Sequence, residues 1–164
     1  MKIMVTGDRG YIGSVLMPML KAKKYEVIGY DSGYFANNLL EDIDENYKKI
    51  TKDIRDLSSK DLKGVDGIIH LAGLSNDPLG EFSPKLTEEI NYHATMRLAQ
   101  LAKNAGVSRF VYASSQSMYG VSNTDNELDE DNSEKNPVTA YAIAKWNAEQ
   151  SGMPSKATKL SKLD

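Results

Sequence analysis

The chain contains no cysteine among its 164 residues. This absence excludes disulfide bonds, metal sites built from thiolates and nucleophilic catalysis by a thiol. It is compatible with the cytoplasm, where we expect the protein to reside. Long apolar runs are also missing, because no stretch approaches the roughly 20 residues of a membrane-spanning helix. The first five residues carry one charge and are too short for a signal peptide, so we interpret them as the first strand.

An excess of charge of one sign is absent as well, because the 20 basic and 23 acidic residues nearly balance. The net charge is −3, which offers no electrostatic reason to expect a nucleic acid or an anionic membrane as partner. Hydrophobic residues make up 40% and charged residues 26% of the chain, a balance typical of a globular domain with a sizeable core. The acidic stretch at residues 125–131 has no ordered ligand spacing. We therefore expect no metal site.

Strand and helix patterns alternate along the first 150 residues. Strands are expected at residues 3–6, 25–30, 47–51, 65–71 and 109–113. Helices are expected at residues 11–23, 85–105 and 138–150, with loops at 32–46 and 121–136. Such alternation indicates an α/β fold, a doubly wound parallel sheet of the Rossmann type. We expect one domain over residues 1–150 and a loosely ordered tail over 151–164, with a short amphipathic turn in that tail as the alternative.

Three glycines spaced three apart, Gly7, Gly10 and Gly13, follow the first strand directly. A tight turn into a helix, with no Cβ in the way, lets backbone N–H groups approach a pyrophosphate. Asp31 ends the second strand, where a carboxylate accepts from ribose hydroxyls and repels a 2′-phosphate. This favours NAD over NADP, although Arg9 is a residue that could serve that phosphate. The alternative for a glycine triplet is a loop without a ligand.

Neighbouring segments extend the predicted cofactor site. Asp53 follows the third strand, where its carboxylate could accept from an adenine amino group while Ile54 packs on the ring. The alternative there is a solvated charge cluster. The small residues at 71–73 leave room for a cofactor, and His70 is expected to be a packed residue. Asn91 lies early in a helix despite its poor propensity, so we expect it to hold backbone or a water behind the site.

Tyr141 and Lys145 stand four residues apart, on one face of a predicted helix. An ammonium beside a phenol favours the phenolate, so Tyr141 could act as a base toward a substrate hydroxyl while Lys145 bonds the nicotinamide ribose. Ser115 follows a strand, at the edge where ligands bind in this architecture, and could donate to the same substrate oxygen. The alternatives are a surface pair without function, and serines at 114 and 115 that only cap the strand.

Together these motifs resemble the extended short-chain dehydrogenase/reductase family, and within it the NAD-dependent nucleotide-sugar epimerases and dehydratases. The resemblance covers about residues 1–150 and is carried by residues 6–13, Asp31, residues 53–56, residues 70–73, Asn91, residues 114–120 and residues 141–145. It implies a bound NAD that takes a hydride from a sugar carbon and later returns it. It also implies that Tyr141 is the base, Lys145 its ribose-binding partner and Ser115 the orienting hydroxyl, with a loop at 74–80 over the nicotinamide end.

The predicted catalytic residues are thus Ser115, Tyr141 and Lys145. The predicted cofactor contacts are Gly7, Arg9, Gly10, Tyr11, Ile12, Gly13, Asp31, Asp53, Ile54, Leu71, Ala72, Gly73, Asn91, Tyr141 and Lys145. Two departures from the family pattern matter. Dehydratases carry Asp-Glu after the catalytic hydroxyl, whereas this chain has Gln116-Ser117, which argues against dehydration and leaves an epimerase or a reductase. Family members are also about twice as long, so the last strands and a small C-terminal substrate domain are expected to be lacking.

Three functions are compatible with these features. The first is an NAD-dependent epimerase-type oxidoreductase acting on a nucleotide-sugar, the second is a truncated NAD-binding module without catalysis of its own, and the third is a fragment with no independent role. The open sheet edge at residues 109–113 should be covered by the tail, a second copy or a partner chain. By the same resemblance, a homodimer would pair the two long helices, with Leu98, Leu101, Ala102, Ile143 and Trp146 as contacts. The alternative is that these residues face the sheet.

Overall fold

The computed structural model describes residues 1–35, 46–75, 77–121 and 127–151. Its centre is a five-stranded sheet of order β3-β2-β1-β4-β5, in which every neighbouring pair is parallel. The strands are β1 (Lys2–Thr6), β2 (Glu26–Asp31), β3 (Lys48–Thr51), β4 (Gly67–His70) and β5 (Arg109–Tyr112). The predicted doubly wound α/β fold is confirmed.

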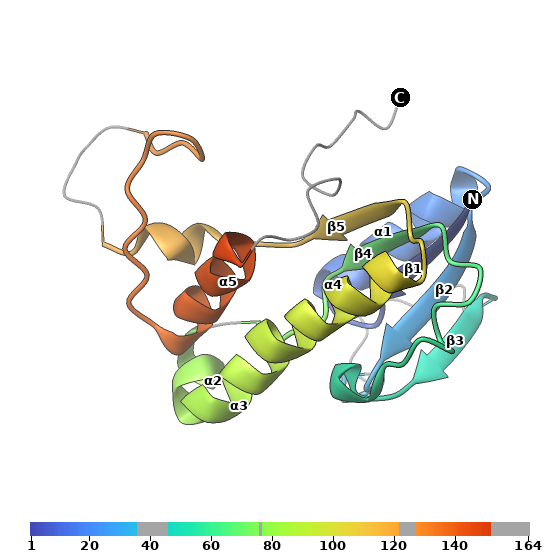
Figure 1. The fold of residues 1–164 in the computed structure, drawn as a ribbon, viewed down its shortest axis with the longest axis horizontal. Coiled ribbons are helices and arrows are strands. Elements are labelled where there is room, and N and C mark those ends of the chain that lie inside the picture. Colours follow the sequence, from blue (N-terminus) through green and yellow to red (C-terminus); the bar gives the residue numbers. More distant parts are fainter. Residues whose placement is uncertain (36–45, 76, 122–126, 152–164) are drawn as a thin grey trace.

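Helices cover both faces of this sheet (Figure 1). They are α1 (Tyr11–Ala22), α2 (Asp77–Phe82), α3 (Pro84–Glu88), α4 (Ala94–Asn104) and α5 (Ala140–Gln150). Three short turns complete the order, the 3-10 helices η1 (Ile54–Asp56) and η3 (Gln116–Tyr119) and the π-helical turn η2 (Glu89–His93). None of the helices in the described ranges is long and apolar enough to cross a membrane.

The alternation of side chains along the strands builds two core layers. Met4 of β1 and Ile68 of β4 pack with Leu98 of α4 on one face. Val5 of β1 packs with Met17 of α1 on the other face. Because both faces are buried, the inner strands are almost continuously apolar, as is typical of a parallel sheet. The carboxyl ends of β1, β2 and β4 therefore meet at one rigid edge, where the candidate site lies.

Two predicted segments differ from the structure. The expected helix at 85–105 runs from Pro84 to Asn104, but η2 interrupts its α-helical pattern. The expected loop at 74–80 is wrong in its second half, because α2 begins at Asp77 with a proline in its first turn, a favoured helix start. Residues 36–45 of the predicted loop and residues 152–164 of the predicted tail lie outside the described residues.

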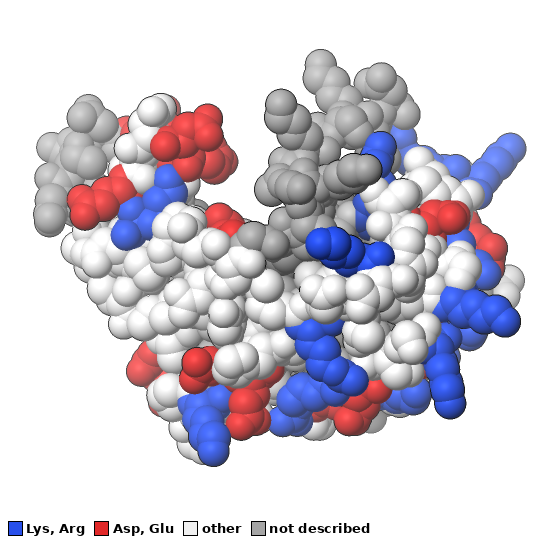
Figure 2. Space-filling model, viewed as in Figure 1, with Lys and Arg blue, Asp and Glu red and all other residues white. Residues whose placement is uncertain are grey.

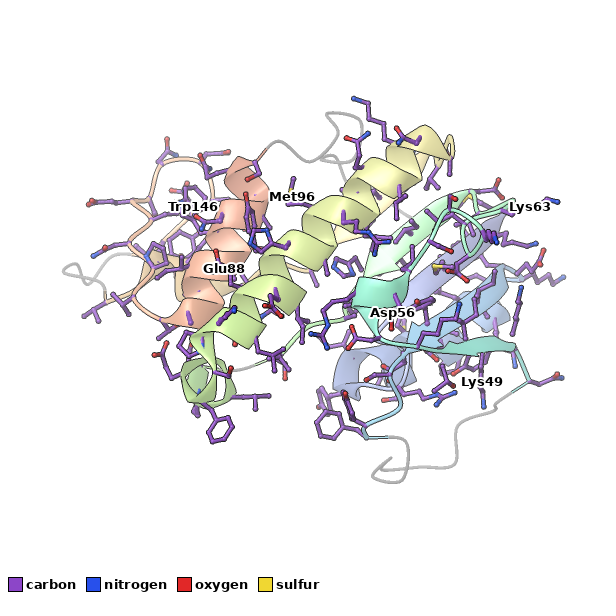
Figure 3. The ribbon with its side chains drawn as sticks, turned by 60° about the horizontal axis from the view of Figure 1, so that its bottom comes forward. Lys49, Asp56, Lys63, Glu88, Met96 and Trp146 are labelled. Carbon is purple, nitrogen blue, oxygen red and sulfur yellow. The ribbon has the colours of Figure 1, made fainter. Side chains whose placement is uncertain are left out.

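The expected dimer contacts divide between core and surface. Leu98 and Ala102 are only 1% and 2% exposed and belong to the α4 core layer, and Leu101 packs against the same cluster. The prediction that Leu98 and Ala102 contact a second copy is therefore wrong, because the core between α4 and the sheet already buries them. Leu101 is only partly buried, and its contact with a second copy stays a prediction. Ile143 on α5 is 43% exposed. Figure 3 shows Trp146 of α5 near Glu88 of α3, the helix against which α5 packs.

Candidate cofactor cavity and active site

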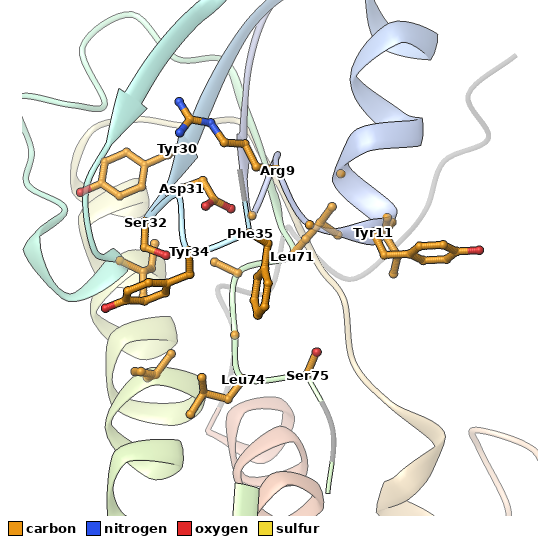
Figure 4. Close-up of a pocket in the computed structure, with 18 of the residues that line it drawn as sticks. Arg9, Tyr11, Tyr30, Asp31, Ser32, Tyr34, Phe35, Leu71, Leu74 and Ser75 are labelled. Carbon is orange, nitrogen blue, oxygen red and sulfur yellow. The ribbon is translucent and has the colours of Figure 1, made fainter. Parts of the chain in front are cut away.

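A cavity of about 610 Å³ opens at the carboxyl ends of β1, β2 and β4, within the roughly 300–1,000 Å³ range of small-molecule sites. Figure 4 shows Arg9, Tyr30 and Asp31 at one end and Leu74 and Ser75 at the other. The predicted contacts that line it are Gly7, Arg9, Gly10, Tyr11, Ile12, Gly13, Asp31, Asp53, Ile54, Leu71, Ala72 and Gly73. Residues from four separate segments are thus brought to one place.

Close packing requires glycine at two of the three loop positions, Gly7 and Gly13. Gly7 has φ +76°, and a Cβ there would lie 2.8 Å from the backbone N of Ala72. A Cβ on Gly13 would lie 2.3 Å from the Gly7 carbonyl oxygen. Gly10 is the N-cap of α1 and supplies no side-chain cap, and the first turn of this helix lines the cavity. The uncapped N–H groups at a helix N-terminus make an electropositive end of the kind that binds phosphates in other proteins.

Asp31 and Arg9 meet at the far end of the cavity. One Asp31 oxygen accepts from the backbone N–H of Gly33 at 2.6 Å, which holds the carboxylate at the cavity wall. The Arg9 guanidinium donates to the Thr51 hydroxyl at 3.1 Å and so reaches from the glycine loop to the end of β3. An acid that can accept from ribose hydroxyls and a base that can bind phosphate are therefore both present.

Asp53 lines the cavity, but its carboxylate is already paired. It accepts from Arg55 through two side-chain bonds of 3.0 and 2.7 Å and one backbone bond of 2.8 Å. Arg55 holds the pKa of Asp53 below its ordinary value, chiefly through these side-chain hydrogen bonds. The expected bond to an adenine amino group would have to share this carboxylate, whereas Ile54 lines the cavity beside it.

Asn91 is not among the residues that line the cavity. Its side chain is 1% exposed, and its amide accepts from Leu74 N at 2.8 Å and donates to Leu74 O at 2.9 Å. Both polar groups are occupied by one backbone unit, so a direct contact with a cofactor is not what this geometry supports. The alternative expectation, that Asn91 holds backbone behind the site, matches these bonds.

The three predicted catalytic residues lie on η3 and α5, which pack against one another, and none of them lines the cavity. Ser115 is the N-cap of η3, where its hydroxyl oxygen accepts from Ser117 N at 3.2 Å. As an acceptor in this bond, it keeps its own hydrogen for donation. Tyr141 and Lys145 share one face of α5, with the ammonium 5.8 Å from the Tyr141 ring centre.

Lys145 is buried, with 5% of its surface exposed. Its ammonium donates to the Ala113 carbonyl at 2.7 Å and lies 4.7 Å from the ring centre of Tyr112. Burial lowers the pKa of Lys145 to about 8, because an ammonium is less well solvated there than in water. The lysine still carries its charge at neutral pH.

Sequence reasoning missed two polar residues beside these sites, the partly buried Tyr112 and the buried Asp8. Tyr112 lies under Lys145, and burial raises the pKa of its phenol, which stays neutral. Asp8 is 1% exposed inside the glycine loop and accepts from the Tyr47 hydroxyl at 2.8 Å. Burial raises the pKa of Asp8. A tyrosine on a strand end and an acid between loop glycines carry no spacing that would have singled them out.

Among the described residues, no three His, Asp or Glu side chains gather where a metal ion could bind. The site thus consists of a cavity of about 610 Å³ and, outside its lining, the Tyr141 phenol, the Lys145 ammonium and the Ser115 hydroxyl. The sequence model of the NAD dependent epimerase/dehydratase family matches residues 3–156. The chain belongs to this family. The predicted family is confirmed. The glycine loop and Asp31 lie at the carboxyl ends of β1 and β2, the edge at which doubly wound folds in general bind dinucleotides.

Relatives within the epimerase/dehydratase family include enzymes of both reaction types. The chain is 34% identical to a Bacillus subtilis protein described as an uncharacterized UDP-glucose epimerase, YtcB, over 92% of this chain and 50% of that one. It is 31% identical to the mouse dTDP-D-glucose 4,6-dehydratase over 90% and 44%. The crystal structure of the dTDP-glucose 4,6-dehydratase DesIV from Streptomyces venezuelae, with NAD and TYD bound, matches with a TM-score of 0.80 and 33% identity over 92% and 50%.

The chain spans about half the length of these relatives.

Proposed function

We propose that this chain is the NAD-binding part of an epimerase that acts on a nucleotide-sugar. The proposal rests on one observation: the glycine loop and Asp31 line the same cavity, and the Tyr141–Lys145 pair lies outside it on α5. When bound, NAD supplies the acceptor for a hydride leaving a sugar carbon. The chain's own residues must then hold the dinucleotide and move one proton.

Each residue has a defined part in this reaction. Tyr141 takes the proton of the sugar hydroxyl as the carbon loses its hydride, and returns that proton when the hydride comes back to the other face. Ser115 donates its free hydroxyl hydrogen to the same oxygen. Lys145 places a positive charge 5.8 Å from the Tyr141 ring centre, and the Ala113 carbonyl and the Tyr112 ring keep the ammonium in place.

Epimerisation is favoured over dehydration by the residues that follow Ser115. Loss of water from a sugar needs an additional group that transfers a proton to the leaving oxygen. Dehydratases of the family carry Asp-Glu here, but this chain has the amide Gln116 and the hydroxyl Ser117 at the start of η3. Neither exchanges protons readily at neutral pH. The relatives include both reaction types, so the choice of epimerisation over dehydration rests on Gln116 and Ser117.

Calorimetric titration of the 164-residue chain with NAD tests the cofactor half of the proposal. We expect saturable binding that weakens about tenfold in Asp31→Ala, because the ribose loses its acceptor. The control is Asp56→Ala, an exposed acid on η1 that does not line the cavity (Figure 3). The control should bind as the parent does. A parent chain that does not bind NAD would overturn the proposal.

A screen of UDP- and dTDP-sugars by NMR tests the reaction. We expect an epimerised sugar with the parent chain and a loss of turnover of at least about a hundredfold in Tyr141→Phe, the lower end of the range for one proton-transfer group. A dehydrated keto-sugar as product would contradict the choice of reaction. NAD binding without turnover of any of these sugars would favour the alternative, an NAD-binding module without catalysis of its own.

A further inference from the structure

A chain of hydrogen bonds between completely buried side chains crosses the sheet behind the cavity. Thr6 ends β1, His70 ends β4 and Thr95 lies in the first turn of α4, and all three are 0% exposed. The Thr6 hydroxyl is 2.6 Å from Nδ1 of His70, and Nε2 of His70 is 2.8 Å from the Thr95 hydroxyl. One imidazole therefore joins two strand ends to a helix.

The direction of every proton in this chain follows from counting hydrogens. The Thr95 hydroxyl donates to the Asn91 carbonyl at 2.9 Å, and a hydroxyl has one hydrogen, so it must accept from Nε2–H of His70. Burial lowers the pKa of His70 to about 3, so the ring is neutral and Nδ1 is an acceptor. Thr6 then donates to Nδ1, and its oxygen accepts from Ala72 N–H at 3.4 Å.

Both ends of the chain are attached to walls of the cavity. Thr6 precedes Gly7, the first residue of the glycine loop, which forms one wall. Ala72 belongs to the segment of residues 72–75, which forms another wall of the same cavity. At the other end, the side-chain amide of Asn91 holds the backbone of Leu74 through its oxygen and its nitrogen. The two walls are thus fixed to the same buried imidazole from both sides.

These walls also touch directly, because a Cβ on Gly7 would be only 2.8 Å from Ala72 N. A small shift of either wall would therefore close or widen the place where a pyrophosphate must enter. We propose that Thr6, His70 and Thr95 are positioning residues. They hold the glycine loop and residues 72–75 at a fixed separation, so that the cavity is preformed for a dinucleotide. This inference rests on the proposed NAD binding.

The test compares two buried threonines of the same helical stretch. Thr95→Val removes the hydroxyl at constant shape, leaves Nε2–H without its acceptor and is expected to weaken NAD binding about tenfold. Thr95→Ser keeps the hydroxyl and should bind NAD within about twofold of the parent. Thr87→Val is the matched control, because Thr87 is also 0% exposed but bonds to the carbonyls of Gly80 and Ser83, outside the cavity lining. It should lower the melting temperature without changing NAD affinity.

Equal NAD affinity in Thr95→Val and the parent, or an equal loss in Thr87→Val, would overturn the positioning role. If Thr95→Val does not fold, Thr6→Val breaks the chain at its other end and replaces it. Amide hydrogen exchange of Ala72 and Leu74 adds a readout without any cofactor. We expect exchange to speed up in Thr95→Val and not in Thr87→Val.

The histidine tautomer separates this inference from the proposed function. Long-range proton–nitrogen NMR spectra of the parent chain without NAD should show His70 protonated at Nε2 alone. A ring protonated at Nδ1 would overturn the chain of bonds whatever the protein binds. Failure of the parent chain to bind NAD, together with an Nε2–H ring and the expected exchange pattern, would refute the proposed function and leave the hydrogen-bond chain as a structural device.

Discussion

At the scale of single residues, Lys145 stands out because it keeps a positive charge in a buried place. Its ammonium is stabilised by the Ala113 carbonyl and by the faces of Tyr112 and Tyr141, 4.7 and 5.8 Å away. These contacts do not replace all of the solvation lost on burial, since the pKa of Lys145 still falls to about 8. The charge that the proposed chemistry requires is thus held at some expense of stability.

Lys145→Met should change how stability depends on pH. The pKa of Lys145 is about 8 in the folded chain, against an ordinary value of 10.5. Between these values the unfolded chain binds more protons, so the free energy of unfolding rises with pH. Urea titrations of the parent should show this rise, about 2 kcal/mol between pH 7 and 9.5. Lys145→Met should lose it, whereas Lys103→Met, at an exposed lysine of α4, should keep it. Parallel curves for the parent and Lys145→Met would contradict the shift.

Gly29 in β2 is a second residue whose identity is dictated by its neighbours, Asp8 above all. A Cβ there would lie 2.1 Å from Oδ2 of Asp8 and 2.7 Å from the Tyr47 ring. Because Asp8 is 1% exposed and held by Tyr47, it cannot move aside freely. Gly29→Ala should therefore cost about 2 kcal/mol in the free energy of unfolding, measured in urea.

The control for Gly29→Ala is another strand glycine. A Cβ on Gly67 in β4 would meet its nearest atom at 3.7 Å, an ordinary contact, so Gly67→Ala should change stability by less than about 0.5 kcal/mol. The double variant Asp8→Ala/Gly29→Ala should cost less than the sum of its two single changes, since its tightest clash, the one with the Asp8 carboxylate, is gone. Additive losses would show that Asp8 is not what excludes the methyl group.

At the scale of elements, the first turn of α5 is held by α2. Thr139 is the N-cap of α5 and accepts from Ala142 N at 3.1 Å, while its own hydroxyl donates to Asp77. Glu81 of α2 accepts from Ala140 N at 2.7 Å. Two carboxylates of one short helix thus bind the N-terminal end of the helix that carries Tyr141, where their negative charge is also favourable for the helix dipole.

Removing this cap should measurably weaken the fold. Thr139→Val loses the acceptor for Ala142 N and should cost about 1 kcal/mol in urea unfolding. Thr139→Ser keeps the hydroxyl and should stay within about 0.5 kcal/mol of the parent. Equal stability of the valine and serine variants would mean that solvent satisfies this helix end as well as Thr139 does.

Much of this arrangement was predictable from local patterns. β1, β2 and β4 are short apolar runs between turn residues, and the glycine loop and Asp31 follow their strands directly, so sequence order alone places them at one edge of a parallel sheet. By contrast, α2 has six residues, too few for a helical periodicity to emerge above its neighbours. A cap that depends on two such short pieces could not be foreseen.

Other features depend on which partner a face meets, and that is a property of the tertiary structure. The apolar side of α4 was recognisable, but the sequence does not say whether Leu98 meets a sheet or a second copy. The bonds that join Thr6, His70 and Thr95 cross 64 and 25 residues of sequence. No local spacing encodes contacts of that range, so a packed His70 was predicted and its partners were not.

At the scale of the whole molecule, the surface around α5 differs from the rest of the face shown in Figure 2, because few charged side chains lie there. Ile143 of α5 is 43% exposed, and Trp146 is half-buried one turn further along. β5 ends the sheet in the described part of the chain, with Val111 38% exposed. Apolar groups thus remain on the surface at α5 and at β5. A second copy that packs its α5 against this helix would bury Ile143.

The predicted homodimer is tested by placing a charge at the centre of this surface. Light scattering of the parent chain should give about twice the 18.1 kDa mass of one chain. Ile143→Glu should give the single-chain mass, because an unpaired carboxylate buried between two α5 helices is strongly unfavourable. Val15→Glu is the matched control, since Val15 is 58% exposed on α1, across the sheet from α4, and should leave the dimer intact. A parent chain of single mass at high concentration would refute the dimer, and dissociation by Val15→Glu would move the interface from α5 to α1.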